Sequence, residues 1–368
     1  MSPESASLAR QRAVEVSGNA SVVEGPLQGY HHETYVFPLP GEVEAARPVR
    51  LKCREPRTNL LWFDRRCFAS EEQLLRALQG NIGGIPDIIQ AGPVGLQRFI
   101  EGETLGSQCG SGRAVPDAIF VQIIALFRQL AGISSGALTV ERRCKARDRA
   151  REGDTSDFLE RLICFTEERV YQENLPVFED LFGSFGVDGD SFKQLRKHVA
   201  GLTERPFCLL HADLHRENFV VDPGGRLWTI DWELAMFGDP LYDLATHLYL
   251  MRYPEDQEDR MKEQWCEAVD GITPGSSADW YDDLPKLLDY KRAQSVFTDV
   301  IRMSLSLGAG PGTDSSLLDR AGSKIQKVLA AAAEPLGLER VPSLPEISAS
   351  LVGWYQKHGE GLGTERAR

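Results

Sequence analysis

Three side chains suited to phosphate chemistry stand close together in the middle of the chain. The block His211-Ala-Asp213-Leu-His-Arg-Glu-Asn218 has the pattern H-x-D-x-x-x-x-N, and Asp231 follows it after a short turn. The aspartate of such a block can orient an acceptor hydroxyl and take its proton, and asparagine and aspartate oxygens suit Mg²⁺. The pattern therefore predicts a phosphoryl-transfer site, with Asp213 as the catalytic base and Asn218 and Asp231 as metal ligands.

A predicted β-hairpin has to bring these groups together. Phe219-Val220-Val221 is followed by the turn Asp222-Pro-Gly-Gly225 and then by Leu227-Trp-Thr-Ile230. Two apolar runs around a Gly-rich turn favour paired antiparallel strands. Asp231, at the exit of the hairpin, should return to the neighbourhood of Asn218.

The two histidines of the block have different expected roles. We expect His211 to order the loop by hydrogen bonding, and His215 to face solvent because it falls outside the motif positions. A purely structural His–Asp pair is the simpler alternative. It leaves the third spaced residue and the hairpin unexplained, since motif matches count only in the right structural context.

These residues, with Ile230-Asp231-Trp-Glu233 and Phe237-Gly-Asp239-Pro-Leu-Tyr-Asp243, resemble the aminoglycoside phosphotransferase family. That family also acts on macrolides and on small hydroxylated metabolites such as choline and homoserine. The resemblance is strong from about residue 209 to 245 and traceable upstream to about residue 25. It implies an α+β, protein-kinase-like bilobal fold, with a small β-rich N-lobe and a large α-helical C-lobe. It also implies Mg²⁺, with ATP or GTP as the phosphoryl donor, and structural hydrogen-bonding roles for Asp239 and Asp243.

Two departures from the protein-kinase motifs limit the class of acceptor molecule. Asp231-Trp-Glu233 stands where protein kinases carry Asp-Phe-Gly, and Ala212 stands where they usually carry Arg. The missing Arg puts regulation by a phosphorylated activation loop in doubt. A free hydroxylated small molecule is favoured over a protein as acceptor.

The region from residue 21 to 102 reads as the nucleotide-binding N-lobe. Strand-forming residues flank Gly25 and Gly29 between Val22 and Leu39, which predicts a hairpin whose tip could approach phosphates; a plain hairpin is the alternative. A short strand at 49–54 then carries Lys52, the candidate for the α- and β-phosphates. Arg50 and Arg54 share its strand face at period 2, so the choice among the three cations stays open.

A helix that begins after Ser70 should supply a partner for the strand cation. Ser70 and Gln73 form a capping-box pattern. Glu71 shares a helix face with the leucines at 74, 75 and 78, and we expect it to pair with Lys52. Glu72 is the alternate, and both could simply be acids favoured by the helix dipole.

The remaining segments complete the expected layout, with a lead-in at 1–20 and a catalytic and substrate-binding C-lobe at 103–368. Phe99 and Ile100 resemble the family's hinge, whose backbone hydrogen-bonds the purine. Because backbone groups leave no side-chain signature, the sequence does not distinguish ATP from GTP. The segment Asp279-Trp280-Tyr-Asp282 is a candidate acceptor wall, with aromatic faces for a ring and carboxylates for amines. A charged helix start is the alternative.

Composition limits the partners. The 368 residues hold 41 Lys and Arg against 54 Asp and Glu, a net charge of −13. That balance argues against nucleic acid or an anionic membrane and is compatible with a cationic substrate. The seven scattered cysteines suit a reducing cytoplasm, and we expect neither a signal peptide nor a membrane span. We expect a monomer or a weak homodimer.

Three functions remain. The leading one is an ATP- or GTP-dependent O-phosphotransferase that modifies a hydroxyl of a small molecule and so confers resistance. The favoured acceptor is an antibiotic, either aminoglycoside-like or another hydroxylated natural product. The second is a kinase of a hydroxylated primary metabolite, similar to choline or homoserine kinases. The third, a nucleotide-binding pseudokinase, is weakened because Lys52, Asp213, Asn218 and Asp231 are all present.

Overall fold

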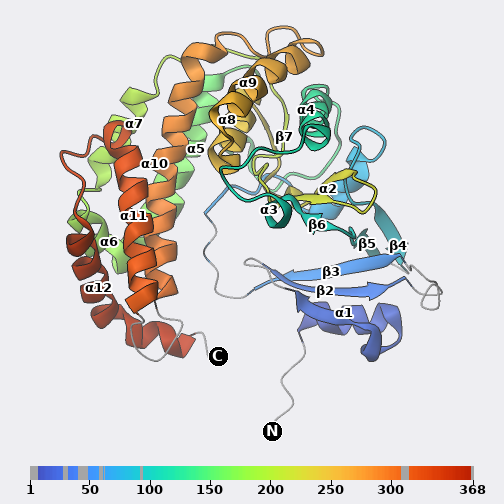
Figure 1. The fold of residues 1–368 in the computed structure, drawn as a ribbon, viewed down its shortest axis with the longest axis horizontal. Helices are drawn as coiled ribbons and strands as arrows, with labels where there is room; N and C mark the ends of the chain where they lie inside the picture. Colours follow the sequence, from blue (N-terminus) through green and yellow to red (C-terminus); the bar gives the residue numbers. More distant parts are fainter. Residues whose placement is uncertain are drawn as a thin grey trace.

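A five-stranded antiparallel sheet forms the first part of the protein (Figure 1). The computed structural model describes residues 7–27, 32–39, 49–57, 61, 63–91, 94–307 and 315–365. Across the sheet the strands follow the order β1 (Glu24–Leu27), β2 (His32–Pro38), β3 (Arg50–Pro56), β5 (Val94–Arg98) and β4 (Ile88–Ala91). Because each of these pairs is antiparallel, short connections suffice to link neighbouring strands.

The two faces of β3 have different tasks. Leu51 and Cys53 are buried in a cluster with Ala9 and Ala13 of helix α1 (Leu8–Ser17), which covers the outer face of the sheet. The helix at 8–17, which was expected to be part of a lead-in, thus packs on the sheet through Ala9 and Ala13. The alternate residues Lys52 and Arg54 lie on the opposite face, since side chains alternate along a strand.

Helix α2 (Glu71–Leu78) follows the sheet's third strand and begins where the sequence predicts. The Ser70 hydroxyl accepts a hydrogen bond from the backbone N–H of Gln73 at 3.2 Å, which caps the first turn. The buried face of the helix consists of Glu71, Leu74, Leu75 and Leu78. The carboxylate of Glu71 is therefore directed inward with the apolar face.

The second part of the protein is mostly helical. It holds the helices α3 (Leu105–Gln108), α4 (Asp117–Ala131), α5 (Thr155–Phe165), α6 (Leu175–Ser184), α7 (Gly189–His198), α8 (Pro240–Met251), α9 (Glu255–Asp270), α10 (Trp280–Ser306), α11 (Ser315–Leu336) and α12 (Leu344–Glu365). A π-helical turn, Thr166–Tyr171, continues α5. The predicted order of a β-rich part followed by an α-rich part is confirmed.

Small strands between the helices carry the central motif. Strand β6 (Glu103–Thr104) pairs with β8 (Phe219–Val221), which pairs with β9 (Leu227–Thr229), and β7 (Cys208–Leu210) pairs with β10 (Met236–Gly238). The predicted hairpin is confirmed in register, with Phe219 opposite Thr229. Since β6 directly follows the last large strand, it ties the hairpin to the segment that joins the two parts.

The helical part contains one extensive apolar core. Trp232, Trp265, Phe192 and Phe297 are among its fully buried side chains, and the last two rings stack at 4.4 Å. Within the described residues, no helix is both long enough and apolar enough to cross a bilayer.

Candidate active site

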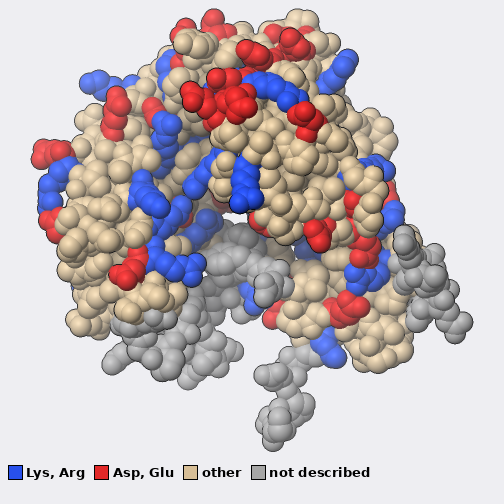
Figure 2. Space-filling view, in the orientation of Figure 1, with Lys and Arg blue, Asp and Glu red and all other residues tan. Residues whose placement is uncertain are grey.

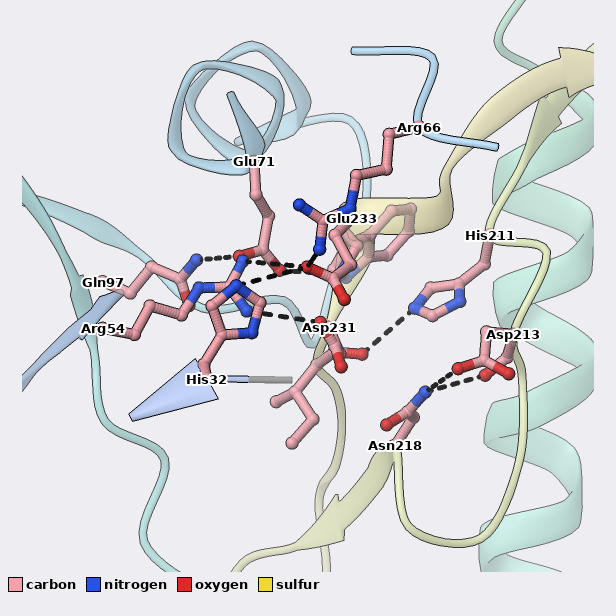
Figure 3. Close-up of polar contacts among 12 residues, drawn as sticks. His32, Arg54, Arg66, Glu71, Gln97, His211, Asp213, Asn218, Asp231 and Glu233 are labelled. Atoms are coloured by element: carbon pink, nitrogen blue, oxygen red, sulfur yellow. Dashed lines mark hydrogen bonds and ion pairs between the residues drawn. The ribbon is translucent and has the colours of Figure 1, made fainter. Parts of the chain in front are cut away.

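The loop before the hairpin brings Asp213 and Asn218 together. The Asn218 side-chain amide donates hydrogen bonds to the Asp213 carboxylate and to its backbone carbonyl, both at 2.9 Å (Figure 3). The backbone N–H of Ile230 donates to the Asn218 carbonyl at 2.9 Å. The exit of the hairpin, and with it Asp231, thus lies beside Asn218 as expected.

His211 links the loop to the residue before Asp231. Its Nε2 lies 3.1 Å from the Ile230 carbonyl oxygen, and its ring lies 4.7 Å from that of Trp232. Burial lowers the pKa of His211. The contact with the Ile230 carbonyl joins the loop to the exit of the hairpin.

Asp243, on helix α8, fixes the backbone at the start of the loop. Its carboxylate accepts hydrogen bonds from the N–H groups of His211, at 3.0 Å, and Ala212, at 2.8 Å. Ala212 has φ 65° and Asp231 has φ 63°, in the left-handed region that non-glycine residues rarely adopt. Such conformations persist where surrounding bonds over-determine them, and they concentrate at functional sites.

His215 is a residue whose place the sequence did not reveal. We expected it to face solvent, but its Nε2 lies 3.3 Å from the Asp213 carboxylate. Burial acts to lower the pKa of His215, but the hydrogen bond to Asp213 and the negative charges of Asp213, Glu217 and Asp231 together raise it. The spacing of Asp213 and His215 is the one sequence feature that agrees with this contact. In a tight loop, two residues separated by one other can direct their side chains to the same side.

The strand cation that meets Glu71 is Arg54, which corrects the expected pairing with Lys52. The Arg54 guanidinium donates to the Glu71 carboxylate and also lies 3.3 Å from Asp231 (Figure 3). Glu71 accepts further hydrogen bonds from the Gln97 side chain and, at 2.7 Å, from the backbone N–H of Trp232. No ion pair joins Glu71 to Lys52, although both residues are described.

Lys52 and Arg54 nevertheless enter the same cavity. Lys52 lines the cleft that also contains Asp213 and Asp231. Burial and the neighbouring Arg54 lower the pKa of Lys52. Two cations of one strand face therefore line the cleft, and one of them, Arg54, is anchored by Glu71.

The segment between the two parts supplies an apolar surface. Phe99 and Ile100 line the cleft, and Ile100 packs in a small cluster with Val220, Trp228 and Ile230 of the hairpin. A flat apolar wall of this kind suits a planar base. Gly29, the other predicted nucleotide-binding residue, lies outside the described residues.

The cleft between the sheet and the helices has a volume of about 1230 Å³. The predicted acceptor residues Asp279, Trp280 and Asp282 are not among those that line it. Asp279 precedes α10 and accepts a hydrogen bond from the Thr203 hydroxyl at 3.0 Å, while Asp282 is exposed. The part of α10 that borders the cleft begins further along the helix, at Lys291.

The two predicted metal ligands, Asn218 and Asp231, line the same cleft. Within the described residues, no group of three or more His, Cys, Asp or Glu side chains could hold a metal ion. The Asn218 amide nitrogen is engaged by Asp213, which leaves its oxygen as an acceptor, and Asp231 supplies a carboxylate. This donor set suits a hard cation whose remaining ligands are phosphate oxygens and water.

The fold, together with a loop that presents Asp213 and Asn218 opposite Arg54 and Asp231, defines a kinase-like phosphotransferase. Residues 54–280 match the model of the phosphotransferase enzyme family described as APH, and the chain belongs to that family. No curated protein sequence matches the chain.

Solved structures agree on the fold. A choline/ethanolamine kinase family protein from Mesorhizobium loti superimposes with a TM-score of 0.52 at 18% identity, covering 93% of this chain and 97% of the other. APH(2″)-IIa, in its complex with gentamicin, gives a TM-score of 0.52 at 14% identity, covering 90% and 99%. At these identities the likeness concerns the fold alone, which is the kinase-like α+β fold predicted from the sequence.

Proposed function

We propose that this phosphotransferase moves the γ-phosphoryl group of ATP or GTP, with Mg²⁺, to a hydroxyl of a small molecule. The observation that carries the proposal is the contact between Asn218 and Asp213, at 2.9 Å, in a cleft also lined by Asp231 and Arg54. Phosphoryl transfer needs alignment and charge neutralisation more than covalent help from the protein. Those residue types, at one cleft, supply both.

Each side chain has a defined task in this proposal. Asp213 orients the acceptor hydroxyl and takes its proton late in the transfer. Asn218 and Asp231 would hold the magnesium ion, which neutralises charge on the phosphates when bound. Arg54, anchored by Glu71, and Lys52 compensate the phosphate charge, and Phe99 and Ile100 border the base.

Two acceptor classes follow from the family: an antibiotic or other hydroxylated natural product, and a primary metabolite. An expressing host tested for antibiotic resistance, beside a metabolite panel assayed by nucleotide consumption, separates the two. A protein that binds nucleotide but transfers phosphate to neither class would instead be a pseudokinase.

The role of Asp213 can be tested separately from acceptor identity. We expect Asp213→Asn to lower turnover about a hundredfold or more, because general-base contributions are of the order of 10²–10⁴. Nucleotide affinity, measured by calorimetry, should stay within a few-fold of the unaltered protein. Near-normal turnover in the folded variant would remove Asp213 from the mechanism.

A further inference from the structure

The carboxylate of Asp213 is held along one edge. Its Oδ2 accepts a hydrogen bond from the Asn218 amide at 2.9 Å and lies 3.3 Å from Nε2 of His215. Both donors therefore converge on one oxygen atom and occupy its lone pairs. No donor of the described residues contacts Oδ1 of Asp213. Because this side chain is partly exposed in the cleft, Oδ1 is the oxygen left for a bound molecule.

Both ring nitrogens of His215 have a partner that fixes their roles. The backbone N–H of Glu217 donates to Nδ1 at 3.2 Å. A backbone N–H can only donate, so Nδ1 accepts and carries no proton in the neutral ring. The ring proton then lies on Nε2, on the side of Asp213. Nε2 also carries a proton in the imidazolium form, so His215 can donate to Asp213 in either protonation state.

The residue that holds Nδ1 is itself anchored. The Glu217 carboxylate accepts a hydrogen bond from the hydroxyl of Thr104, in β6, at 2.9 Å. It also lies so close to Gly106 that a Cβ at that position would collide with it. The N–H of Gly106 donates to the Arg216 carbonyl at 3.1 Å. The backbone of 216–217 therefore has little freedom, and the position of the His215 ring follows from it.

The side chain of Arg216 is a second anchor of the loop. It is buried, and its guanidinium donates to the carbonyl groups of Met251 at 3.1 Å, Cys109 at 2.9 Å and Arg113 at 2.8 Å. These bonds tie the loop to the end of α8 and to the segment before α4. A ring that is mounted on such a loop can orient its partner side chain, because the ring does not depend on that partner for its own position.

We infer that His215 is a positioning residue that, together with Asn218, determines which oxygen of Asp213 acts as the base. The inference rests on the proposed phosphotransferase function and adds a residue to it. The two donors hold Oδ2 and direct Oδ1 to the acceptor hydroxyl. As the hydroxyl oxygen bonds to the γ-phosphorus, the bond from that phosphorus to the bridging oxygen of the leaving nucleoside diphosphate breaks, and the hydroxyl proton passes to Oδ1.

His215 acts through Asp213 and not as a base of its own. Its Nδ1 faces the Glu217 N–H and its Nε2 carries the proton beside Asp213, so neither nitrogen offers a lone pair to the cleft. The ring nevertheless lines the cleft, whose opening between the helical part and the sheet is visible in Figure 2. Without the ring, the Asn218 amide alone holds the carboxylate, which can then turn about its Cβ–Cγ bond. Loss of a fixed orientation slows a reaction that depends on alignment.

The contact can be tested without an acceptor. In protein labelled with ¹⁵N-histidine, at an alkaline pH where the ring is neutral, nitrogen chemical shifts should show His215 as the Nε2–H tautomer. His215→Asn identifies the resonances by their loss. Asp213→Asn should shift the Nε2 resonance more than the Nδ1 resonance. An Nδ1–H tautomer would overturn the inference.

Transfer to water provides the kinetic test. Hydrolysis of MgATP, or of MgGTP if that nucleotide binds more tightly, is followed in single turnovers with the protein in excess. His215→Leu should slow hydrolysis about tenfold, as expected for the loss of a hydrogen bond to a charged group. The affinity for the magnesium-bound nucleoside diphosphate, measured by calorimetry, should not change. Asp213→Asn should slow hydrolysis further than His215→Leu does.

Matched substitutions separate the two contacts of the ring. Glutamine can place an amide N–H near the position of Nε2, so His215→Gln should retain most of the rate. Asparagine can place its amide oxygen near the position of Nδ1, so His215→Asn keeps the bond from Glu217 but should be as slow as His215→Leu. It also repeats the test if His215→Leu does not fold. His198→Leu is the control, because Nε2 of His198 lies 2.8 Å from Asp289 on α10 and should not affect hydrolysis.

Several outcomes would overturn the inference. A rate that His215→Asn retains and His215→Gln loses would assign the effect to the Glu217 contact. Equal losses in all three His215 variants, or a loss of nucleotide affinity in them, would assign the ring a structural role. If His215→Leu hydrolyses nucleotide like the unaltered protein while Asp213→Asn does not, the inference fails and the proposed function stands. If Asp213→Asn is unimpaired as well, the proposed function fails with it.

Discussion

Arg54 and Lys52 extend from the same face of β3, but their surroundings give them different tasks. Arg54 is bound to Glu71 and lies 3.3 Å from Asp231, whereas Lys52 has no described ion-pair partner. A guanidinium group that is bound to a buried carboxylate has few accessible orientations, so its charge is preorganised for a bound phosphate. We therefore expect Arg54 to contribute more than Lys52 to nucleotide affinity through Glu71.

A double-mutant cycle tests this assignment. Arg54→Ala and Glu71→Ala should each raise the nucleotide KM, and the double variant should cost clearly less than the sum, because the two residues act as a unit. Lys52→Ala combined with Glu71→Ala should be nearly additive. Arg50→Ala, whose guanidinium binds Glu24 and Glu101, is the matched control on the same strand. Coupling of Glu71 to Lys52, with none to Arg54, would restore the pairing expected from the sequence.

Cys144 offers a test of electrostatics away from the cleft. A hydrogen bond with the Cys67 thiol lowers the pKa of Cys144 to about 6, against the opposing effect of burial and with help from Arg149. A lowered pKa means that the thiolate, the reactive form, is present above pH 6. Alkylation of Cys144 by iodoacetamide, followed by mass spectrometry, should rise through about pH 6 and then level off.

Cys266 serves as an internal control for the alkylation measurement. Burial raises the pKa of Cys266 to about 11, so its alkylation should stay slow at neutral pH. A Cys144 rate that increases only above pH 8 would mean that its thiol has an ordinary pKa.

At the scale of elements, a buried arginine connects three segments around the site. The Arg205 guanidinium binds Asp239, before α8, at 2.9 Å and Asp283, in the first turn of α10, at 2.5 Å. Its Nε also donates to the Ala278 carbonyl at 2.7 Å. Because α8 carries Asp243 and α10 borders the cleft from Lys291, this contact helps to set the position of the loop at 211–218 relative to α10.

Removal of that arginine should be costly. Arg205→Met leaves the buried Asp239 without its cationic partner and leaves Asp283 with Lys286 alone. Breaking a buried ion pair in this way costs about 3–5 kcal/mol. Chemical denaturation measures the loss. Adding Asp239→Asn should recover part of the stability, because that buried carboxylate charge is then removed. An unchanged unfolding midpoint in Arg205→Met would contradict the buried network.

The elements themselves were largely readable from the sequence. Local patterns fixed the hairpin that ends at Asp231, and the N-cap Ser70 with its leucine face predicted α2 and the inward direction of Glu71. The strand cation that contacts Glu71 is decided by the position of α2 along β3. Lys52 and Arg54 share one face of the strand, so the alternation of side chains along β3 cannot distinguish them. The acceptor wall was misplaced for a similar reason: α10 has 27 residues, and tertiary packing decides which of its turns borders the cleft.

At the scale of the whole molecule, the proposed magnesium and nucleotide sites would join the sheet to the helical part. Asp231 belongs to the helical part and Arg54 to the sheet, so a bound MgADP would contact both. Any ligand that binds only the folded state stabilises it, by about 2.7 kcal/mol at a hundredfold excess over Kd. We expect a single thermal unfolding transition, whose midpoint temperature rises when MgADP is added.

Metal removal tests the same connection. Addition of EDTA should abolish most of the stabilisation by ADP, because the phosphate charge is then left uncompensated. Asp231→Ala should show little difference between ADP with and without Mg²⁺, whereas Asp259→Asn, on the exposed surface of α9, should behave like the unaltered protein. Equal magnesium dependence in Asp231→Ala would remove Asp231 from the metal site.

Glu71 also bears on how nucleotide enters and leaves. Its carboxylate binds Arg54 and Gln97 of the sheet and, at the same time, the backbone N–H of Trp232 in the helical part. A hinge motion that parts the two lobes must break the bond to Trp232 or separate α2 from the sheet. The rate at which product departs would then depend on a single carboxylate releasing one backbone amide.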